Sequence, residues 1–171
     1  IIFNKNQSYT VKPVVIERQR LQDLEGNLML FFTGFSRFSS GIAQKHIQNI
    51  SKNDLVLKRM HEMVDESINL LQGEDDLSRF GDLLHETWGL KKTLSDSVSS
   101  NEIDEIYLKG IKNGAIGGKI LGAGGGGFIL FFVPKDLQEK VRKALNELIY
   151  VPFKFDNSGS KVVLYQPEGL V

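Results

Sequence analysis

Cysteine is absent from this chain of 171 residues, which can therefore form no disulfide and offers neither a thiol nucleophile nor a thiolate ligand. The three histidines, His46, His61 and His85, lie far apart without the close spacing of a zinc-binding pair. We therefore expect no metal held by the side chains of this chain. A chain without disulfides fits the reducing cytoplasm, and we expect a cytoplasmic protein.

An excess of either charge is also lacking. Lysine and arginine together number 21, as do aspartate and glutamate, so the formal net charge is zero. Binding to nucleic acid or to an acidic membrane surface relies on clustered positive charge, so we expect neither partner. The longest apolar runs, "LMLFF" and "FILFFV", are too short to cross a bilayer as a helix. No signal-peptide pattern opens the chain, and its start at Ile1 indicates a fragment of a longer protein.

The order of predicted elements indicates one domain over residues 1–171. An opening hairpin in "IIFNKNQSYTVKPVVI" is followed by a short helix at 17–24 and a buried strand in "NLMLFFT". Three amphipathic helices fill the middle: one capped by Asn53 or Asp54, one starting near Asp75 or Asp76, and one with a capping box of Ser99 and Glu102.

The last third of the chain returns to strands. The predicted order is a strand in "FILFFV", a helix over 134–148, a strand in "YVPFKF", and a final strand in "KVVLYQ". Strands at both ends with helices between them predict an α+β fold, in which helices pack on a mostly antiparallel sheet. A ferredoxin-like arrangement fits this order best.

A glycine block stands between a short extended segment and the strand "FILFFV". It consists of Gly122, Ala123, Gly124, Gly125, Gly126 and Gly127. The block matches G-x-G-x-x-G, but a dinucleotide-binding loop leads into a helix rather than a strand. A Walker A loop needs Ser or Thr after Gly118-Lys119, where Ile120 stands, and too few residues follow for a protein-kinase domain.

Two interpretations of the glycine block remain from the residues alone. Its exposed N–H groups can form a concave anion-binding nest, because no side chain covers the backbone. Alternatively, the glycines only permit a tight turn or close packing. Five glycines in six residues exceed what a two-residue hairpin turn requires, which favours the anion-binding interpretation.

The stretch "GGKILGAGGGGFILFF" resembles the third, C-terminal glycine-rich motif of the GHMP kinases. "LMLFFTGFSRFSS", "LLHETWGLKKTLS" and "NEIDEIYLKGIKNGAIGGKILGAGGGG" resemble the members that phosphorylate D-glycero-D-manno-heptose 7-phosphate. The resemblance covers essentially the whole chain. It implies the C-terminal domain of an ATP-dependent sugar kinase.

The resemblance also implies which parts belong to another half of the protein. The family's phosphate loop, Pro-x-x-x-Gly-Leu-Gly-Ser-Ser-Ala, does not occur here, and the catalytic aspartate and magnesium-binding glutamate belong to the N-terminal half. We therefore expect no catalytic residue in this chain, and ATP and Mg²⁺ bound mainly by that half. The expected partners are a sugar or sugar-phosphate substrate, the N-terminal half, and in a homodimer a second copy.

Three side chains join the glycine block as candidates for substrate or phosphate binding. Lys119 precedes the block and can add positive charge, unless it is a solvated surface lysine. Arg37 follows a buried strand where a helix begins, a favourable place for an anion, although an exposed arginine beside a helix cap is the alternative. Trp88 can stack on a sugar, but a lone tryptophan is more often part of the core.

The sequence therefore leaves two functions of different classes open. One is the C-terminal half of a sugar kinase, and the other is a non-catalytic ferredoxin-like module that binds a ligand or another chain.

Overall fold

A four-stranded antiparallel sheet with helices around it forms the body of the molecule. The computed structural model describes residues 1–35, 52–156, 159 and 162. The sheet has the spatial order β4-β5-β3-β6. Its strands are β3 (Leu28–Phe32), β4 (Gly117–Ile120), β5 (Phe128–Phe132) and β6 (Ile149–Tyr150). The helices are α1 (Arg18–Gly26), α3 (Asp54–Gln72), α4 (Ser78–Thr93), α5 (Asn101–Lys112), the 3₁₀ turn η2 (Lys135–Leu137) and α6 (Gln138–Ala144).

The strand order is that of the ferredoxin-like fold. The chain runs from β3 through α3, α4 and α5 to β4, and β5 lies between these two strands. It then runs from β5 through α6 to β6, with β3 between. Because strands of the two β-α-β units alternate in this order, the units interleave. Every neighbouring pair of strands is antiparallel. The expected α+β class is confirmed.

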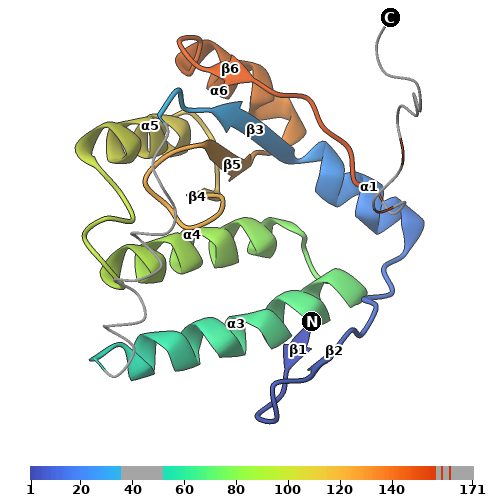
Figure 1. Cartoon of the computed structure of the whole chain (residues 1–171). Helices are drawn as coiled ribbons and strands as arrows, with labels where there is room; N and C mark the ends of the chain where they lie inside the picture. Colours follow the sequence, from blue (N-terminus) through green and yellow to red (C-terminus); the bar gives the residue numbers. More distant parts are fainter. Residues whose placement is uncertain (36–51, 157–158, 160–161, 163–171) are drawn as a thin grey trace, which may run out of the picture.

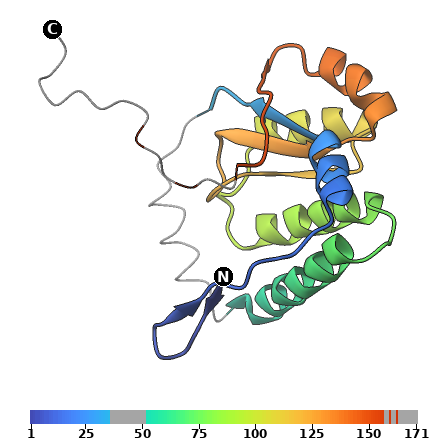
Figure 2. The same cartoon turned by 90° about the vertical axis from the view of Figure 1, so that its right-hand side faces the viewer.

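The two faces of the sheet are covered differently. One face packs on α5 and α6, where Phe31, Ile129 and Phe131 from the central strands are fully buried. On the other face Leu28 and Phe132 join Leu24 of α1 in a smaller cluster. Helices α3 and α4 lie below the sheet in both views, with α4 nearer to it (Figures 1 and 2). This layout leaves the β4-β5 turn at an end of the sheet.

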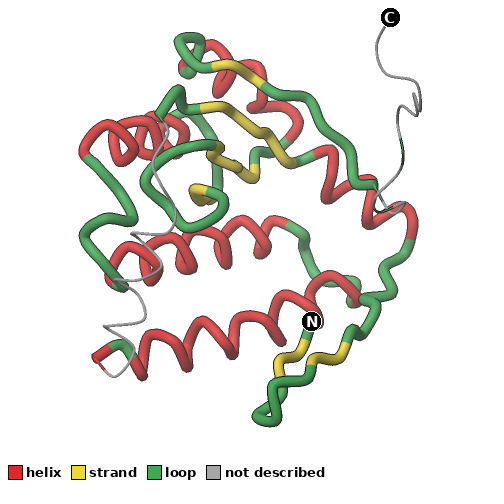
Figure 3. Tube along the Cα trace, viewed as in Figure 1, coloured by secondary structure: helices red, strands yellow, loops and turns green. Residues whose placement is uncertain are grey.

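The opening hairpin forms, but it stands apart from the sheet. Its strands β1 (Ile2–Phe3) and β2 (Tyr9–Thr10) pair antiparallel over two residues each. Figure 3 shows them away from the four central strands. Apolar side chains of the hairpin, Phe3 at 82% and Tyr9 at 68%, are exposed.

Three expected boundaries were wrong. The third middle helix is capped by Ser100, whose hydroxyl accepts from the Ile103 N–H at 3.4 Å, rather than by Ser99. The helix expected over 134–148 is divided into η2 and α6 and ends at Ala144. The strand expected over 150–155 stops early, because Pro152 has no N–H to continue the ladder after Val151 donates to Leu30. The final strand predicted in 161–166 lies outside the described residues apart from Val162.

None of the helices in the described part of the chain is long and apolar enough to cross a membrane.

Candidate functional site

The glycine block is the turn of the β4-β5 hairpin. The Leu121 N–H donates to Phe128 O at 2.8 Å and closes the ladder, so residues 122–127 form the glycine loop. All five glycines have positive φ, at 71°, 116°, 76°, 148° and 83° for Gly122, Gly124, Gly125, Gly126 and Gly127. Side chains of L-residues rarely adopt this conformation. The backbone shape of the loop therefore requires the glycines.

Close packing adds a second requirement at two of these positions. A Cβ at Gly124 would lie 2.8 Å from Val98 O, and one at Gly126 would lie 2.6 Å from Phe35 O. At Gly122 and Gly127 the same atom would meet nothing within 4 Å. The first and the last residue of the loop, Gly122 and Gly127, therefore each have open space where a side chain would begin.

Two neighbouring segments hold the loop through backbone hydrogen bonds. Gly125 N–H donates to Val98 O at 2.8 Å, in the connection between α4 and α5. Gly127 N–H donates to Phe35 O at 2.7 Å, just after β3. The backbone N–H and the hydroxyl of Thr33 both donate to Gly127 O, at 2.9 Å each. The loop is thus fixed at one end of the sheet, between the α4–α5 connection and the segment that follows β3.

The other four amides of the loop have no acceptor among the described residues. Within the described part of the chain, no acceptor bonds the N–H groups of Gly122, Ala123, Gly124 or Gly126. Fixed N–H donors without acceptors of their own are the elements of an anion-binding nest. Of the six residues predicted to contact phosphate, four therefore keep their amide available, while the amides of Gly125 and Gly127 are used to hold the loop.

A buried lysine that sequence reasoning missed supports the start of the loop. Lys91 of α4 is only 8% exposed, and its Nζ donates to Gly122 O at 2.5 Å and to Ile120 O at 3.4 Å. Burial, and secondarily the charge of Lys119, lowers the pKa of Lys91 to about 8. The sequence held one signal for it: Lys91 follows the apolar Trp88 at helical spacing i, i+3, on the side of α4 that faces the core.

Lys119 stands on β4 at the entry to the loop. Its side chain is half-buried, and burial lowers its pKa below the usual value. It forms no hydrogen bond or ion pair with any described residue. Its ammonium is therefore unpaired within the described part of the chain, three residues before the glycine loop.

The other two side chains predicted to bind substrate are Trp88 and Arg37. Trp88 is 1% exposed and packs at a tilt on Tyr107, with ring centroids 6.1 Å apart. Trp88 also contributes to the lining of a cavity of about 260 Å³, together with Lys92, whose Nζ lies 5.9 Å from the centroid of the Trp88 ring. Its burial fits a core residue, and its stacking on a sugar stays a prediction. Arg37 lies outside the described residues.

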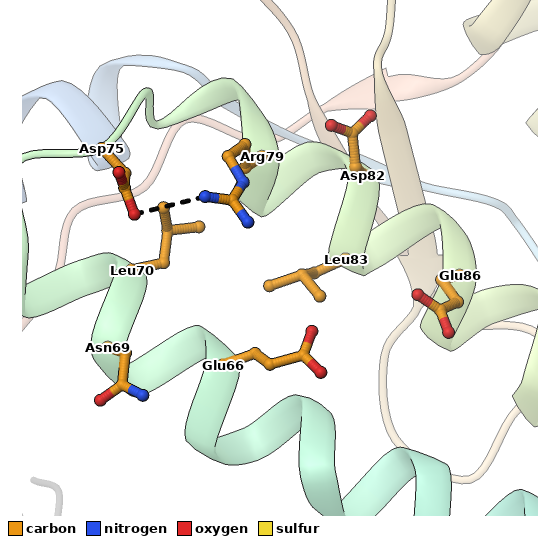
Figure 4. A pocket seen from close by; sticks show the side chains of 8 residues that line it. All are labelled: Glu66, Asn69, Leu70, Asp75, Arg79, Asp82, Leu83 and Glu86. Carbon is orange, nitrogen blue, oxygen red and sulfur yellow. Dashed lines mark hydrogen bonds and ion pairs between the residues drawn. The ribbon is translucent and has the colours of Figure 1, made fainter.

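A separate cavity of about 350 Å³ lies between α3 and α4 and includes no residue of the glycine loop (Figure 4). Its carboxylates are largely engaged: Glu66 and Glu86 both bond Arg59, and Asp75 pairs with Arg79 at 3.3 Å. Among the described residues, no group of three or more acidic, histidine or cysteine side chains is placed to hold a metal. We therefore assign the candidate site to the glycine loop.

Known proteins resemble this chain in sequence and in fold. Residues 68–151, which include the glycine loop, match the family model "GHMP kinases C terminal". The chain is 32% identical over 163 residues to D-glycero-alpha-D-manno-heptose 7-phosphate kinase of Campylobacter jejuni, covering 93% of this chain and 48% of that protein.

Solved structures show the same fold. A D-glycero-D-manno-heptose 1-phosphate kinase from Bacteroides thetaiotaomicron matches at 26% identity with a TM-score of 0.59, over 90% of this chain and 40% of that one. Mevalonate kinase of Methanococcus jannaschii matches at 21% identity with a TM-score of 0.65, over 86% and 44%. The chain thus spans less than half the length of each relative named here.

The fold, the glycine loop and these matches define a GHMP kinase C-terminal domain, and this chain belongs to that family. Heptose phosphate kinases are among its relatives by sequence and by structure.

Proposed function

We propose that this chain is the C-terminal half of an ATP-dependent kinase that transfers the γ-phosphate of ATP to a sugar or sugar phosphate. The observation that carries the proposal is the glycine loop, in which four amides have no acceptor among the described residues and which follows the half-buried Lys119 on β4. A heptose 7-phosphate is the proposed substrate, supported by the name of the Campylobacter jejuni relative.

The proposed role of the loop follows from the chemistry of phosphoryl transfer. The transition state spreads negative charge over the phosphoryl oxygens, and catalysis comes mainly from positioning and from electrostatic stabilisation. The N–H groups of Gly122, Ala123, Gly124 and Gly126 donate to these oxygens or to the phosphate of the sugar. They stand in place before the reaction, so no reorganisation is needed when the charge develops.

Lys119 adds a positive charge to the same region. Half-burial favours its neutral form, and a phosphate oxygen nearby would favour the charged form again. Arg37 is proposed as a second cation for the substrate phosphate, from the sequence alone.

ATP and Mg²⁺ are proposed to be bound mainly by an N-terminal half, which would also supply the carboxylate that takes the proton of the sugar hydroxyl. The donor set of the glycine loop fits a phosphate rather than a metal ion, because N–H groups and an ammonium offer no lone pair. We propose that the chain alone is inactive, that the complete protein is cytoplasmic, and that it can form a homodimer.

The test is an ADP-release assay on the complete protein with ATP and Mg²⁺. D-glycero-D-manno-heptose 7-phosphate, the corresponding 1-phosphate, L-fucose and mevalonate are compared at equal concentrations. The 7-phosphate should give the highest kcat/KM, and mass spectrometry should show a bisphosphate product. Turnover with another of these acceptors only would refute the substrate, and no phosphoryl transfer to any acceptor would refute the proposed function.

A further inference from the structure

The contact between Lys91 and Gly122 does more than fill space beneath the glycine loop. Lys91 is a buried cation, and no carboxylate pairs with it among the described residues. Buried lysines are rare without a partner, because removing the ammonium from water is costly. Here the Gly122 and Ile120 carbonyl oxygens replace part of the lost hydration, so the loop and the lysine depend on each other.

The geometry of the peptide unit carries the effect of this contact to the other side of the loop backbone. No described peptide bond is cis, so the carbonyl of Gly122 and the N–H of Ala123, which share one planar unit, point in opposite directions. Lys91 bonds the Gly122 oxygen at 2.5 Å. The Ala123 N–H must therefore point away from Lys91, and it is one of the four free amides.

The other free amides are oriented by different contacts. The hydrogen bond from the Gly125 N–H to Val98 O fixes the plane of the peptide unit 124–125. The bond from the Gly127 N–H to Phe35 O fixes the unit 126–127 in the same way. Neither contact fixes the unit 122–123 at the start of the loop. Within the described part of the chain, that unit is bonded by Lys91 only.

We propose that Lys91 is a positioning residue of the phosphoryl-transfer site: by holding the Gly122 carbonyl, it aims the Ala123 N–H at the transferred phosphoryl group. The proposal rests on the function proposed above, since the aimed donor needs a phosphoryl group to receive it. Lys91 itself touches neither ATP nor sugar in this role.

The first experiment measures the loop without relying on activity. In the complete protein, Lys91→Met removes the donors and keeps an unbranched side chain. Lys92→Met is the matched control, because Lys92 is the next residue of α4 and pairs with Asp104 at 3.1 Å instead. Hydrogen–deuterium exchange of a peptide spanning 121–128 should rise about tenfold in Lys91→Met, while exchange in β3 stays unchanged. The control should not change either peptide.

The second experiment measures kinetics on the same variants. A lost donor to the transition state should lower kcat on the order of a hundredfold while KM for the sugar stays within about threefold. Lys91→Arg, which keeps the charge and the donors, should recover at least about a tenth of the wild-type kcat by the same logic. If Lys91→Met does not fold, Lys91→Gln takes its place, with a neutral donor on a shorter stem and an intermediate loss expected in both experiments.

The outcomes separate this inference from the proposed function. Loop exchange equal to that of Lys92→Met would overturn the positioning role, whether or not the protein is a kinase. Faster loop exchange with kcat unchanged would overturn it as well. A wild-type protein without kinase activity would instead refute the proposed function. It would also refute the proposal that the Ala123 N–H points at a phosphoryl group, even if Lys91 holds the loop.

Discussion

The backbones of Gly81 and Gly117 are in direct contact, so that a Cβ placed on Gly117 would overlap the carbonyl oxygen of Gly81. The same Cβ would lie 2.8 Å from the backbone nitrogen of His85, one turn further along α4. Helix α4 therefore packs on β4 at a distance that only glycine permits. This contact sets the distance between α4 and the β4-β5 hairpin, and therefore also the position of Lys91 relative to that hairpin.

Gly117→Ala should unfold the domain or weaken it severely. The added methyl group meets backbone atoms of α4, which cannot move aside as a flexible side chain would, and we expect a loss of about 3 kcal/mol or more. Gly89→Ala is the control, since Gly89 lies in the same helix with nothing within 4 Å of the added atom. The control should gain up to about 1 kcal/mol. Urea unfolding of the complete protein measures both, and similar midpoints would contradict the close contact.

Periodicity and apolar runs in the sequence were enough to predict the fold class and the order of the elements from β3 to β6, while the final strand expected in 161–166 stays a prediction. The strands "LMLFF" and "FILFF" pair along their full length, from Leu28 with Phe132 to Phe32 with Phe128, because both are apolar on both faces. Boundaries were less certain where adjacent residues compete for the same role. Ser99 and Ser100 can each cap a helix, and only the tertiary structure assigns Ser99 to Asp104.

The glycine loop was recognisable from its residues, whereas its support was not. The spacing of Lys91 from Trp88 places it on the core-facing side of α4, but only the packing of α4 on β4 brings Lys91 to the Gly122 carbonyl. The sequence also gave no sign of which amides are consumed by Val98 and Phe35, since these partners lie far away along the chain.

Ser100→Ala should cost about 1 kcal/mol, because the first turn of α5 loses the side-chain acceptor for the Ile103 N–H. Ser99→Ala is the matched change one residue earlier and removes only a hydroxyl that bonds the side chain of Asp104 at 2.9 Å. It should cost less than half as much. Thermal unfolding compares the two, and an equal or larger loss in Ser99→Ala would restore Ser99 as the cap.

The buried Lys91 predicts a stability difference that depends on pH. Its pKa of about 8 lies below the usual 10.5, so between these values the unfolded chain binds a proton that the folded chain does not. Stability should therefore rise with pH across this window. Relative to Lys91→Met, the wild-type protein should gain on the order of 3 kcal/mol from pH 8 to pH 10.5, with little change below pH 7. The measurement is urea unfolding of both proteins at each pH. A constant difference would show that burial leaves the pKa of Lys91 unshifted.

The chain by itself should not consume ATP. The glycine loop is proposed to position a phosphoryl group, while the phosphate loop and the catalytic carboxylate are proposed to belong to another half. ADP release by the 171-residue chain should stay at background with ATP, Mg²⁺ and each sugar phosphate. The complete protein serves as the positive control. Clear turnover that increases with the amount of the isolated chain would contradict the division of roles.

Gly122 is a position of the glycine loop at which effects on catalysis can be separated from effects on folding, because its amide does not hold the loop as that of Gly127 does. At Gly126 an alanine would press on Phe35 O, so lost activity there could not be distinguished from a displaced loop. At Gly122 the methyl group meets nothing within 4 Å, and the cost arises only from a φ of 71°. Gly122→Ala should lower the free energy of unfolding by about 1 kcal/mol or somewhat more.

Activity should fall much further than stability in Gly122→Ala. The strained residue shifts the peptide unit that carries the Ala123 N–H, and a methyl group then stands where a phosphate oxygen is proposed to approach. Loss of a preorganised donor costs on the order of a hundredfold in rate. Gly159→Ala is the control, with a φ of 64° and nothing within 4 Å, outside the loop. Both variants of the complete protein are compared by kcat/KM and by urea midpoint. If activity in Gly122→Ala declines only as far as the folded fraction does, the glycines serve the turn alone and the phosphate-binding role is refuted.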